Sequence, residues 1–228
     1  MSDITDRSSS SSATTVDDRQ RVSAPLGVHI GAGSDPRVLG LMAFALGTLV
    51  VGIATIGQFP LSAMAAVIPI AFFCSGLALA AASIWSFILG MSFLAGTFGI
   101  VAGFFSSYSI LLLGLDHNWF AVSTSATGSF DEVFFIVWCC FFLALLLPSL
   151  RLPVIYPLTV ALLVVYLALS ATGTYGGIGS GNVSTAAGAS ILAASLLLFW
   201  GYLAASLTAL NARITLPEGP VLLTGRSD

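Results

Sequence analysis

Asp35-Pro36-Arg37-Val38-Leu39-Gly40-Leu41 opens an apolar run that continues without a further charged residue to Gly57. Asp35 is of a residue type that caps helices, and proline suits the first helical position after a cap. The run is about twenty residues long, which is the length that an α-helix needs to cross a bilayer. The sequence before it is polar and most of the sequence after it is apolar. It therefore marks the point where a polar tail becomes a membrane protein.

The composition of the whole chain points to the same class of protein. Of the 228 residues, 57% are apolar and 7% are charged, and the mean hydropathy is +1.01. Soluble domains carry roughly 25% charged residues. We therefore predict an all-α membrane protein with no large soluble domain. The small net charge of −3 argues against a nucleic-acid partner.

The chain divides into three parts by composition. Residues 1–34 are rich in Ser, Thr, Asp and Arg and lack the apolar core of a signal peptide. We interpret them as a disordered cytoplasmic tail, either simply solvated or regulated through its serines. Residues 35–210 form the predicted transmembrane domain, and residues 211–228 form a short cytoplasmic tail.

Six apolar segments predict a six-transmembrane-helix bundle. Pro69 lies inside the second segment and removes one backbone hydrogen bond, so we expect a kink there. Polar or glycine-rich loops are expected at Gln58, Gly114–Ser129 and Gly173–Thr185. The six predicted spans are Val38–Gly57, Pro60–Ala82, Ile84–Leu113, Phe130–Leu150, Leu152–Thr172 and Ala186–Leu210.

The arginines predict the orientation of the bundle. All 7 basic residues are Arg, and six crossings place every one of them on the same side. Cytoplasmic segments carry the excess of basic residues in membrane proteins. Both termini are therefore predicted to be cytoplasmic, and the protein is predicted to be a multi-pass protein of the plasma membrane.

No Asp, Glu, Lys, Arg or His lies near the middle of any predicted span. Catalysis needs a nucleophile with a base, or a metal held by His and carboxylates, and neither set can be assembled here. Three cysteines lie in apolar segments without a CxxC spacing. We therefore expect no enzymatic activity, no metal and no cofactor. A translocation path would be lined by hydroxyls, backbone, glycine and aromatic rings.

The third predicted span is rich in small residues. Gly99 and Gly103 form a GxxxG pattern, which lets helix backbones approach closely. Gly90, Ala95 and Gly96 precede them. These residues either serve ordinary close packing or make room for a permeant molecule.

Three motifs resemble the acetate uptake transporter family, which includes the bacterial succinate–acetate permeases. Asp35-Pro36-Arg37-Val38-Leu39-Gly40-Leu41 is similar to the family signature Asn-Pro-Ala-Pro-Leu-Gly-Leu, with Pro36, Leu39, Gly40 and Leu41 matching. Gly96-Thr97-Phe98-Gly99 resembles the Thr-Ser-Tyr-Gly of the third helix. Leu210-Asn211 with Arg213-Ile214-Thr215-Leu216-Pro217 resembles the ending after the sixth helix. The resemblance covers about Asp35 to Pro217.

The resemblance implies a homo-hexamer in which each subunit has its own pathway, narrowed by two aromatics and a leucine. At the matching positions of this chain the resemblance places Phe44, Phe98 and Leu163. Packing in the core is the alternative role for each of them. The signature implies that Asp35, Leu39 and Gly40 help to form the mouth of the pathway. Gly96, Thr97 and Gly99 would contribute close packing or pathway lining in the third helix.

The chain departs from the family pattern at several positions. Asp35 replaces the signature Asn, and Arg37-Val38 replaces Ala-Pro. The acidic residue that ends the family's second helix falls near Ser83 and is missing. Phe98 lacks the hydroxyl of the family's tyrosine. These departures bear on the substrate more than on the fold.

The sequence supports two hypotheses for the function. The first is a transporter or channel-like permease for small monocarboxylates, acetate first and succinate as a further candidate, with any proton carried on the substrate itself. An apolar constriction penalises a bare anion and favours a neutral or briefly desolvated small acid. The second is a non-transporting membrane scaffold or regulatory subunit that binds partners through its small-residue faces.

Overall fold

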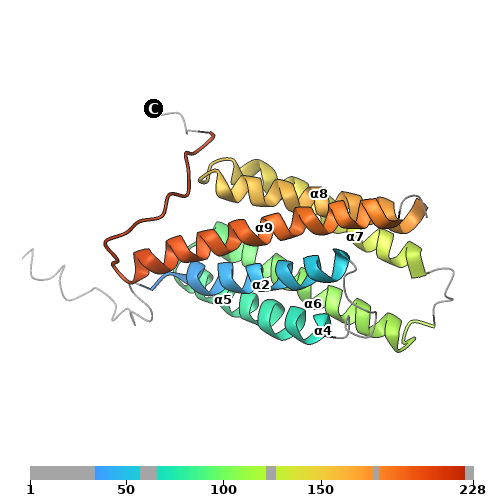
Figure 1. The fold of residues 1–228 in the computed structure, drawn as a ribbon. Coiled ribbons are helices and arrows are strands. Elements are labelled where there is room, and N and C mark those ends of the chain that lie inside the picture. Colours follow the sequence, from blue (N-terminus) through green and yellow to red (C-terminus); the bar gives the residue numbers. More distant parts are fainter. Residues whose placement is uncertain (1–33, 57–65, 122–126, 177–179, 224–228) are drawn as a thin grey trace, which may run out of the picture. The chain divides into compact units, whose positions relative to one another are not determined.

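The computed structural model describes residues 34–56, 66–121, 127–176 and 180–223. The tail predicted over residues 1–34 and the loop predicted at Gln58 lie outside these ranges, apart from Ser34. Every named element within them is helical. The elements are α2 (Pro36–Ile56), α4 (Val67–Pro69), η1 (Ile70–Leu77), α5 (Ala78–Ile88), α6 (Ser92–Asp116), α7 (Thr127–Ser149), α8 (Ile155–Gly176) and α9 (Ser180–Ala209) (Figure 1).

Six helices in the described part of the chain are long and apolar enough to cross a membrane. Five are α2, α6, α7, α8 and α9, and the sixth is the continuous span Val67–Ile88 made by α4, η1 and α5. This confirms the predicted all-α architecture with six spans. The segment after Pro69 is π-helical, so the hydrogen-bonding pattern changes at that proline. A kink at Pro69 stays a prediction.

The turn between the second and third spans corrects the predicted boundary. Ile84 does not begin the third span, because α5 continues to Ile88 and α6 begins at Ser92. Met91 N donates to Ser86 O and Gly90 N donates to Phe87 O, which is the Schellman ending of a helix. Gly90 has φ +75° and lies in this turn rather than in a span.

The glycine-rich loop predicted over Gly173–Thr185 is largely helical. α8 continues to Gly176 and α9 begins at Ser180, six residues before the predicted start at Ala186. Glycine and serine favour loops in water. At the end of a membrane span a helix satisfies the backbone groups internally, and this outweighs their weak helix propensity.

α9 packs against both α2 and α8, and the three helices lie side by side in Figure 1. The contact with α2 is close because it is made by small residues. Ser195 Oγ donates to Ala45 O over 2.9 Å, and a Cβ on Gly188 would lie 3.2 Å from Gly52 O. Residue numbers rise along one helix as they fall along the other, so the pair is antiparallel.

α6 packs closely against α5 and η1, whereas its backbone has few contacts with α7. Aromatic side chains fill the wider space between α6 and α7. The Phe104 ring of α6 lies 5.2 Å from Trp138 and 6.2 Å from Phe142 of α7, both nearly edge to face. Such pairs stabilise a contact beyond the area they bury.

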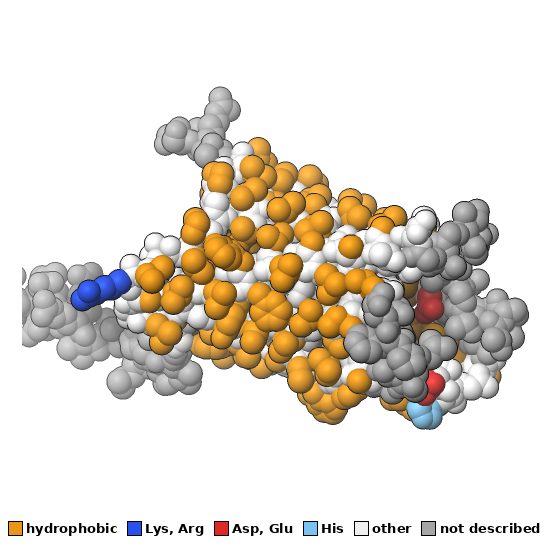
Figure 2. Space-filling model, viewed as in Figure 1, with side chains coloured by type: hydrophobic (Ala, Val, Ile, Leu, Met, Phe, Trp, Pro, Cys, Tyr) orange, Lys and Arg blue, Asp and Glu red, His pale blue; other side chains and the backbone are white. Residues whose placement is uncertain are grey.

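Large apolar side chains also cover much of the outside of the described helices. Phe87, Leu147 and Leu196 are 75%, 70% and 69% exposed, and orange side chains dominate the face shown in Figure 2. An apolar outer surface suits lipid hydrocarbon or a neighbouring subunit.

Candidate functional site

Asp35 and Arg37 form a compact pair at the start of α2. Arg37 N donates to Asp35 Oδ1 over 2.9 Å, so Asp35 caps the helix as its sequence position predicts. Arg37 Nε donates to Asp35 Oδ2 over 2.8 Å, and Arg37 Nη2 lies 2.7 Å from the same oxygen. Both oxygens of the Asp35 carboxylate are therefore already bound by Arg37.

The Phe98 ring lies directly over Gly40. A Cβ on Gly40 would approach three atoms of the ring closer than 3.0 Å, a separation that real Cβ atoms do not show. Phe98 is only 2% exposed. The structure thus brings together two residues from separate motifs, the signature on α2 and the Gly96-Thr97-Phe98-Gly99 motif on α6. The glycine is needed at this position because the ring fills its side-chain space.

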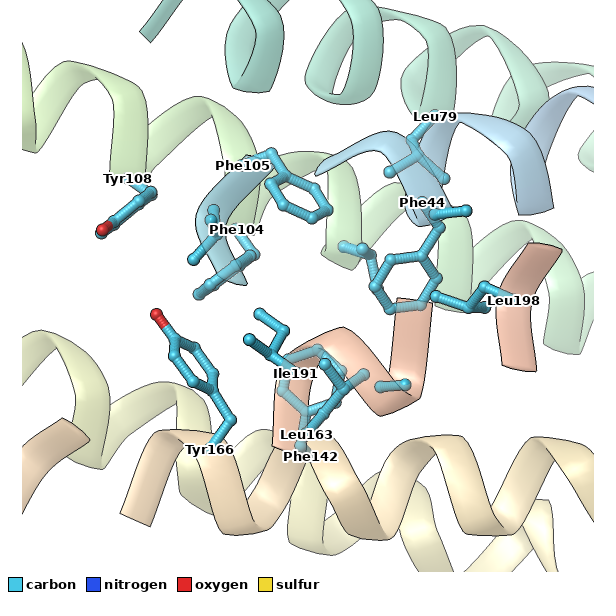
Figure 3. Packing of buried hydrophobic residues seen from close by; sticks show 14 of the residues in the cluster. Phe44, Leu79, Phe104, Phe105, Tyr108, Phe142, Leu163, Tyr166, Ile191 and Leu198 are labelled. Atoms are coloured by element: carbon cyan, nitrogen blue, oxygen red, sulfur yellow. The ribbon is translucent and has the colours of Figure 1, made fainter. Parts of the chain in front are cut away.

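A second glycine–phenylalanine contact lies two turns further along the same two helices. A Cβ on Gly47 would lie 2.5 Å from the Phe105 ring. Phe44 lies between the two contacts on α2, and its ring meets Phe105 edge to face with centroids 6.0 Å apart. Residue numbers increase in the same direction along both helices, from Gly40 with Phe98 to Gly47 with Phe105, so α2 and α6 are parallel. Phe44 is 6% exposed and points into the bundle (Figure 3).

Leu163 reaches the same apolar cluster from α8. It is 3% exposed and belongs to the cluster that contains Phe44 and Phe98. Phe142 and Ile191 belong to the same cluster and are labelled with it in Figure 3. The aromatics thus meet at the α2–α6 contact, while the leucine approaches from the part of the bundle where α8 packs on α9 and α7.

The three remaining residues singled out on the third helix differ in their surroundings. A Cβ on Gly99 would lie 2.8 Å from Ser83 Oγ, so α5 and α6 approach closely there. Ser83 Oγ also donates to Ala95 O over 2.7 Å. Gly96 has no atom within 4 Å of its Cβ position. Thr97 donates to Phe93 O of its own helix. Of the three, Gly99 is the one in close contact with another helix of the chain.

Hydroxyl groups are the main polar side chains inside the described bundle. Most of the buried ones donate to a carbonyl one turn earlier, as Thr48, Ser109 and Thr159 do. Ser195 departs from this pattern by donating to Ala45 O of α2, and Ser75 departs from it in a way that sequence reasoning missed. Its Oγ is fully buried and has no hydrogen-bond partner among the described residues. It lies in π-helical η1 and faces Gly47, whose Cβ position is 2.7 Å away.

The segment Pro217–Leu223, here termed the C-terminal strap, is part of the fold rather than a free tail. Val154 N donates to Pro220 O over 3.0 Å and Ile155 N donates to Glu218 O over 3.4 Å. These amides lie at the start of α8, where helix N–H groups lack partners within the helix. Trp200 Nε1 of α9 donates to Pro217 O over 2.9 Å. The strap therefore ties α8 to α9.

Glu218 carries the strap to the start of α2. Its Oε1 accepts a hydrogen bond of 3.2 Å from the Tyr156 hydroxyl and lies 3.8 Å from Arg37 Nη1. The signature pair, the strap and the start of α8 thus form one polar cluster of Asp35, Arg37, Tyr156 and Glu218 at one end of the bundle. The sequence showed Glu218 only as an acidic residue in a tail.

The arrangement offers an apolar interior with a polar cluster at one end. Within the described ranges, no three His, Cys, Asp or Glu side chains lie together as metal ligands do. Charged groups at the end could bind a polar solute, whereas the interior is made of apolar side chains, aromatic rings and a few hydroxyls.

Comparisons with known proteins bear on the family and the fold of the chain. The profile of the GPR1/FUN34/yaaH family matches residues 28–222. Among solved structures, the chain is similar to one described as the structure of the bacterial acetate channel SatP, with a TM-score of 0.71 and 22% identity. That match covers 81% of this chain and 98% of the other, and at this identity it shows a shared fold. No curated protein sequence matches significantly.

Proposed function

The chain belongs to the GPR1/FUN34/yaaH family, and on this basis we propose that it is a multi-pass membrane channel or transporter for acetate and related small monocarboxylates. The similarity of its fold to that of a bacterial acetate channel supports acetate as the first substrate to test. Succinate is a further candidate. The proposed location is the plasma membrane, with both termini in the cytoplasm.

The observation that carries the proposal is the Phe98 ring over Gly40. The ring occupies the side-chain space of the signature glycine and is buried with Phe44 and Leu163 in one apolar cluster. A cluster of this kind inside a six-span bundle imposes a large desolvation penalty on a bare ion. A small acid that crosses it carries its proton or sheds water only briefly. We assign Phe44, Phe98 and Leu163 to the constriction of this pathway.

The signature residues have distinct roles in this proposal. Asp35 and Pro36 fix the start of α2, since the carboxylate caps the helix and proline begins it. Gly40 admits the Phe98 ring. Leu39 and Leu41 flank that contact, and Leu39 is 37% exposed whereas Leu41 is 4% exposed. Gly96, with an open Cβ position, and Thr97 are available to a neighbouring subunit, in keeping with a homo-oligomer, proposed to be a hexamer.

Uptake by proteoliposomes tests the proposal. The purified full chain is reconstituted, and the initial uptake of labelled acetate, propionate, butyrate and succinate is compared with that of empty vesicles. The proposal expects acetate uptake above empty vesicles, competition by the other short acids and a rate that falls with acid size. Absence of uptake by protein that remains folded and oligomeric would favour the non-transporting scaffold instead.

A further inference from the structure

The C-terminal strap lies across the end of the bundle where α2 begins. Its carbonyls cap the start of α8, and the Pro153–Val221 bridge adds a short antiparallel contact. Gly219 has φ +86°, and a Cβ there would clash with Val154. A left-handed glycine at a crowded position indicates a defined path for the strap rather than a loose approach.

The strap delivers a carboxylate to two converging donors. The Tyr156 hydroxyl and Arg37 Nη1 both point to Glu218 Oε1, at 3.2 Å and 3.8 Å. Arg37 uses its Nε and Nη2 on Asp35. A guanidinium has five N–H donors in a fixed fork, so the Nη1 side remains for a second carboxylate. At 3.8 Å the contact with Glu218 is a loose ion pair rather than a hydrogen bond.

The side chains of Arg37 and Glu218 are 33% and 20% exposed, so solvent reaches the pair. An anion from solution can therefore compete for Arg37 without first opening the apolar core. A part-exposed ion pair contributes little free energy. The carboxylate of a free small acid is the same chemical group as that of Glu218 and can therefore compete with it for Arg37.

We propose that the strap is a carboxylate-released latch: Glu218 occupies the Arg37–Tyr156 donor pair in the resting state, and a free small monocarboxylate displaces it and loosens the strap at this end of the bundle. The proposal deepens the proposed function, since the displacing anion is the proposed substrate. It assigns to Arg37, which stands where the family signature has alanine, the recognition of that anion.

Hydrogen exchange tests release of the strap without any measurement of transport. The full chain in lipid nanodiscs is compared in sodium acetate and in sodium chloride of equal concentration. The amides of Val154, Ile155 and Leu223 report on the strap because their partners are Pro220 O, Glu218 O and Leu150 O. We expect faster exchange of these amides in acetate than in chloride. Equal exchange in the two salts would overturn the proposal.

The variant Glu218→Gln removes the tethered charge and keeps the size of the side chain. It is expected to show fast exchange in chloride and no further increase in acetate. Glu132→Gln, the same chemical change on α7, serves as the matched control and should behave as the parent does. In vesicles at low acetate, Glu218→Gln should raise initial uptake about two- to fivefold, as expected for loss of a part-exposed ion pair.

A reversible crosslink tests whether release matters for uptake. Pro153 and Val221 face each other in the antiparallel bridge, where Cα atoms are about 4.5–5.5 Å apart, within the range of a disulfide. The pair Pro153→Cys/Val221→Cys is made with Cys74, Cys139 and Cys140 replaced by Ala. Uptake should be low when oxidised and recover on reduction of the same sample, so folding is controlled internally. Full uptake in the oxidised form would contradict the latch.

The two proposals fail separately. If acetate accelerates exchange of the strap amides but the reduced protein takes up no acetate, the latch stands and transport fails. If the reduced and oxidised proteins take up acetate equally, transport stands and the latch fails.

Discussion

Gly40 has no side chain, and the Phe98 ring occupies the space that a Cβ would take. Gly96 is also a glycine in a described helix, yet its Cβ position is open. The two residues look alike in the sequence, and both belong to motifs that resemble the family. Their roles differ because only one of them faces a ring from another helix.

Gly40→Ala is therefore expected to destabilise the protein by about 1–3 kcal/mol, the usual effect of overpacking a tight core. Gly96→Ala should be neutral or stabilising by up to about 1 kcal/mol, since alanine favours a helix over glycine. Thermal unfolding in detergent measures both. In a Phe98→Ala background the effect of Gly40→Ala should shrink. An equal loss in both backgrounds would show that the ring is not the cause.

Ser75 and Ser195 are both fully buried serines with opposite expected responses to alanine. Ser195 Oγ donates to Ala45 O and joins α9 to α2, so Ser195→Ala should cost about 1 kcal/mol. Ser75 Oγ has no partner among the described residues, so Ser75→Ala should leave stability unchanged or raise it. Chemical unfolding of the two variants side by side decides this. A larger loss for Ser75→Ala would indicate a partner for its hydroxyl.

At the scale of elements, hydropathy predicted that six spans exist but not where each one ends. Ile84–Ile88 is apolar and leads without a charged residue into the apolar sequence of α6, so hydropathy could not separate the second span from the third. The signal that could have done so was Gly90, which takes the left-handed conformation at the end of α5. Composition also misled at residues 180–185, where serine and glycine suggested a loop that the structure shows as helix.

The C-terminal strap was beyond sequence reasoning for a different reason. Its partners, Leu150, Val154 and Trp200, lie far from it in sequence, and Pro217–Leu223 has no periodicity that would assign it a structure. The contact of Phe98 with Gly40 was likewise hidden, because each residue could be singled out but their pairing depends on how α6 lies against α2.

Removal of the strap should destabilise the bundle. A chain that ends at Leu216 loses the backbone partners of Val154, Ile155 and Leu150 and the Trp200 bond. At about 0.5–1.5 kcal/mol for each of the four bonds, we expect a loss of about 2–6 kcal/mol. A chain that ends at Leu223 keeps all of these bonds and should match the parent. Denaturant unfolding in mixed micelles compares them, and equal midpoints for the two truncations would contradict a structural role.

At the scale of the molecule, family membership and six membrane-length helices define a multi-pass membrane protein. Its predicted orientation rests on the distribution of 7 arginines. In intact cells, a membrane-impermeant maleimide should label His117→Cys, and should label Ile214→Cys only after permeabilisation, in a chain otherwise free of cysteine. Both positions are well exposed, Ile214 to 68% and the His117 side chain to 55%. The reverse pattern would place the termini outside.

The most direct test of a pathway narrowed at Phe98 is the ratio of butyrate to acetate uptake. It is measured in proteoliposomes that contain the parent, Phe98→Ala or Phe93→Ala. Phe93 lies on the same helix but is 43% exposed, so it controls for loss of a ring alone. We predict acetate uptake by the parent and a ratio about tenfold higher for Phe98→Ala, since pockets discriminate one or two methylenes by about this factor. Phe93→Ala should keep the parent ratio. A folded parent without acetate uptake, or one ratio shared by all three proteins, would contradict a pathway narrowed at Phe98.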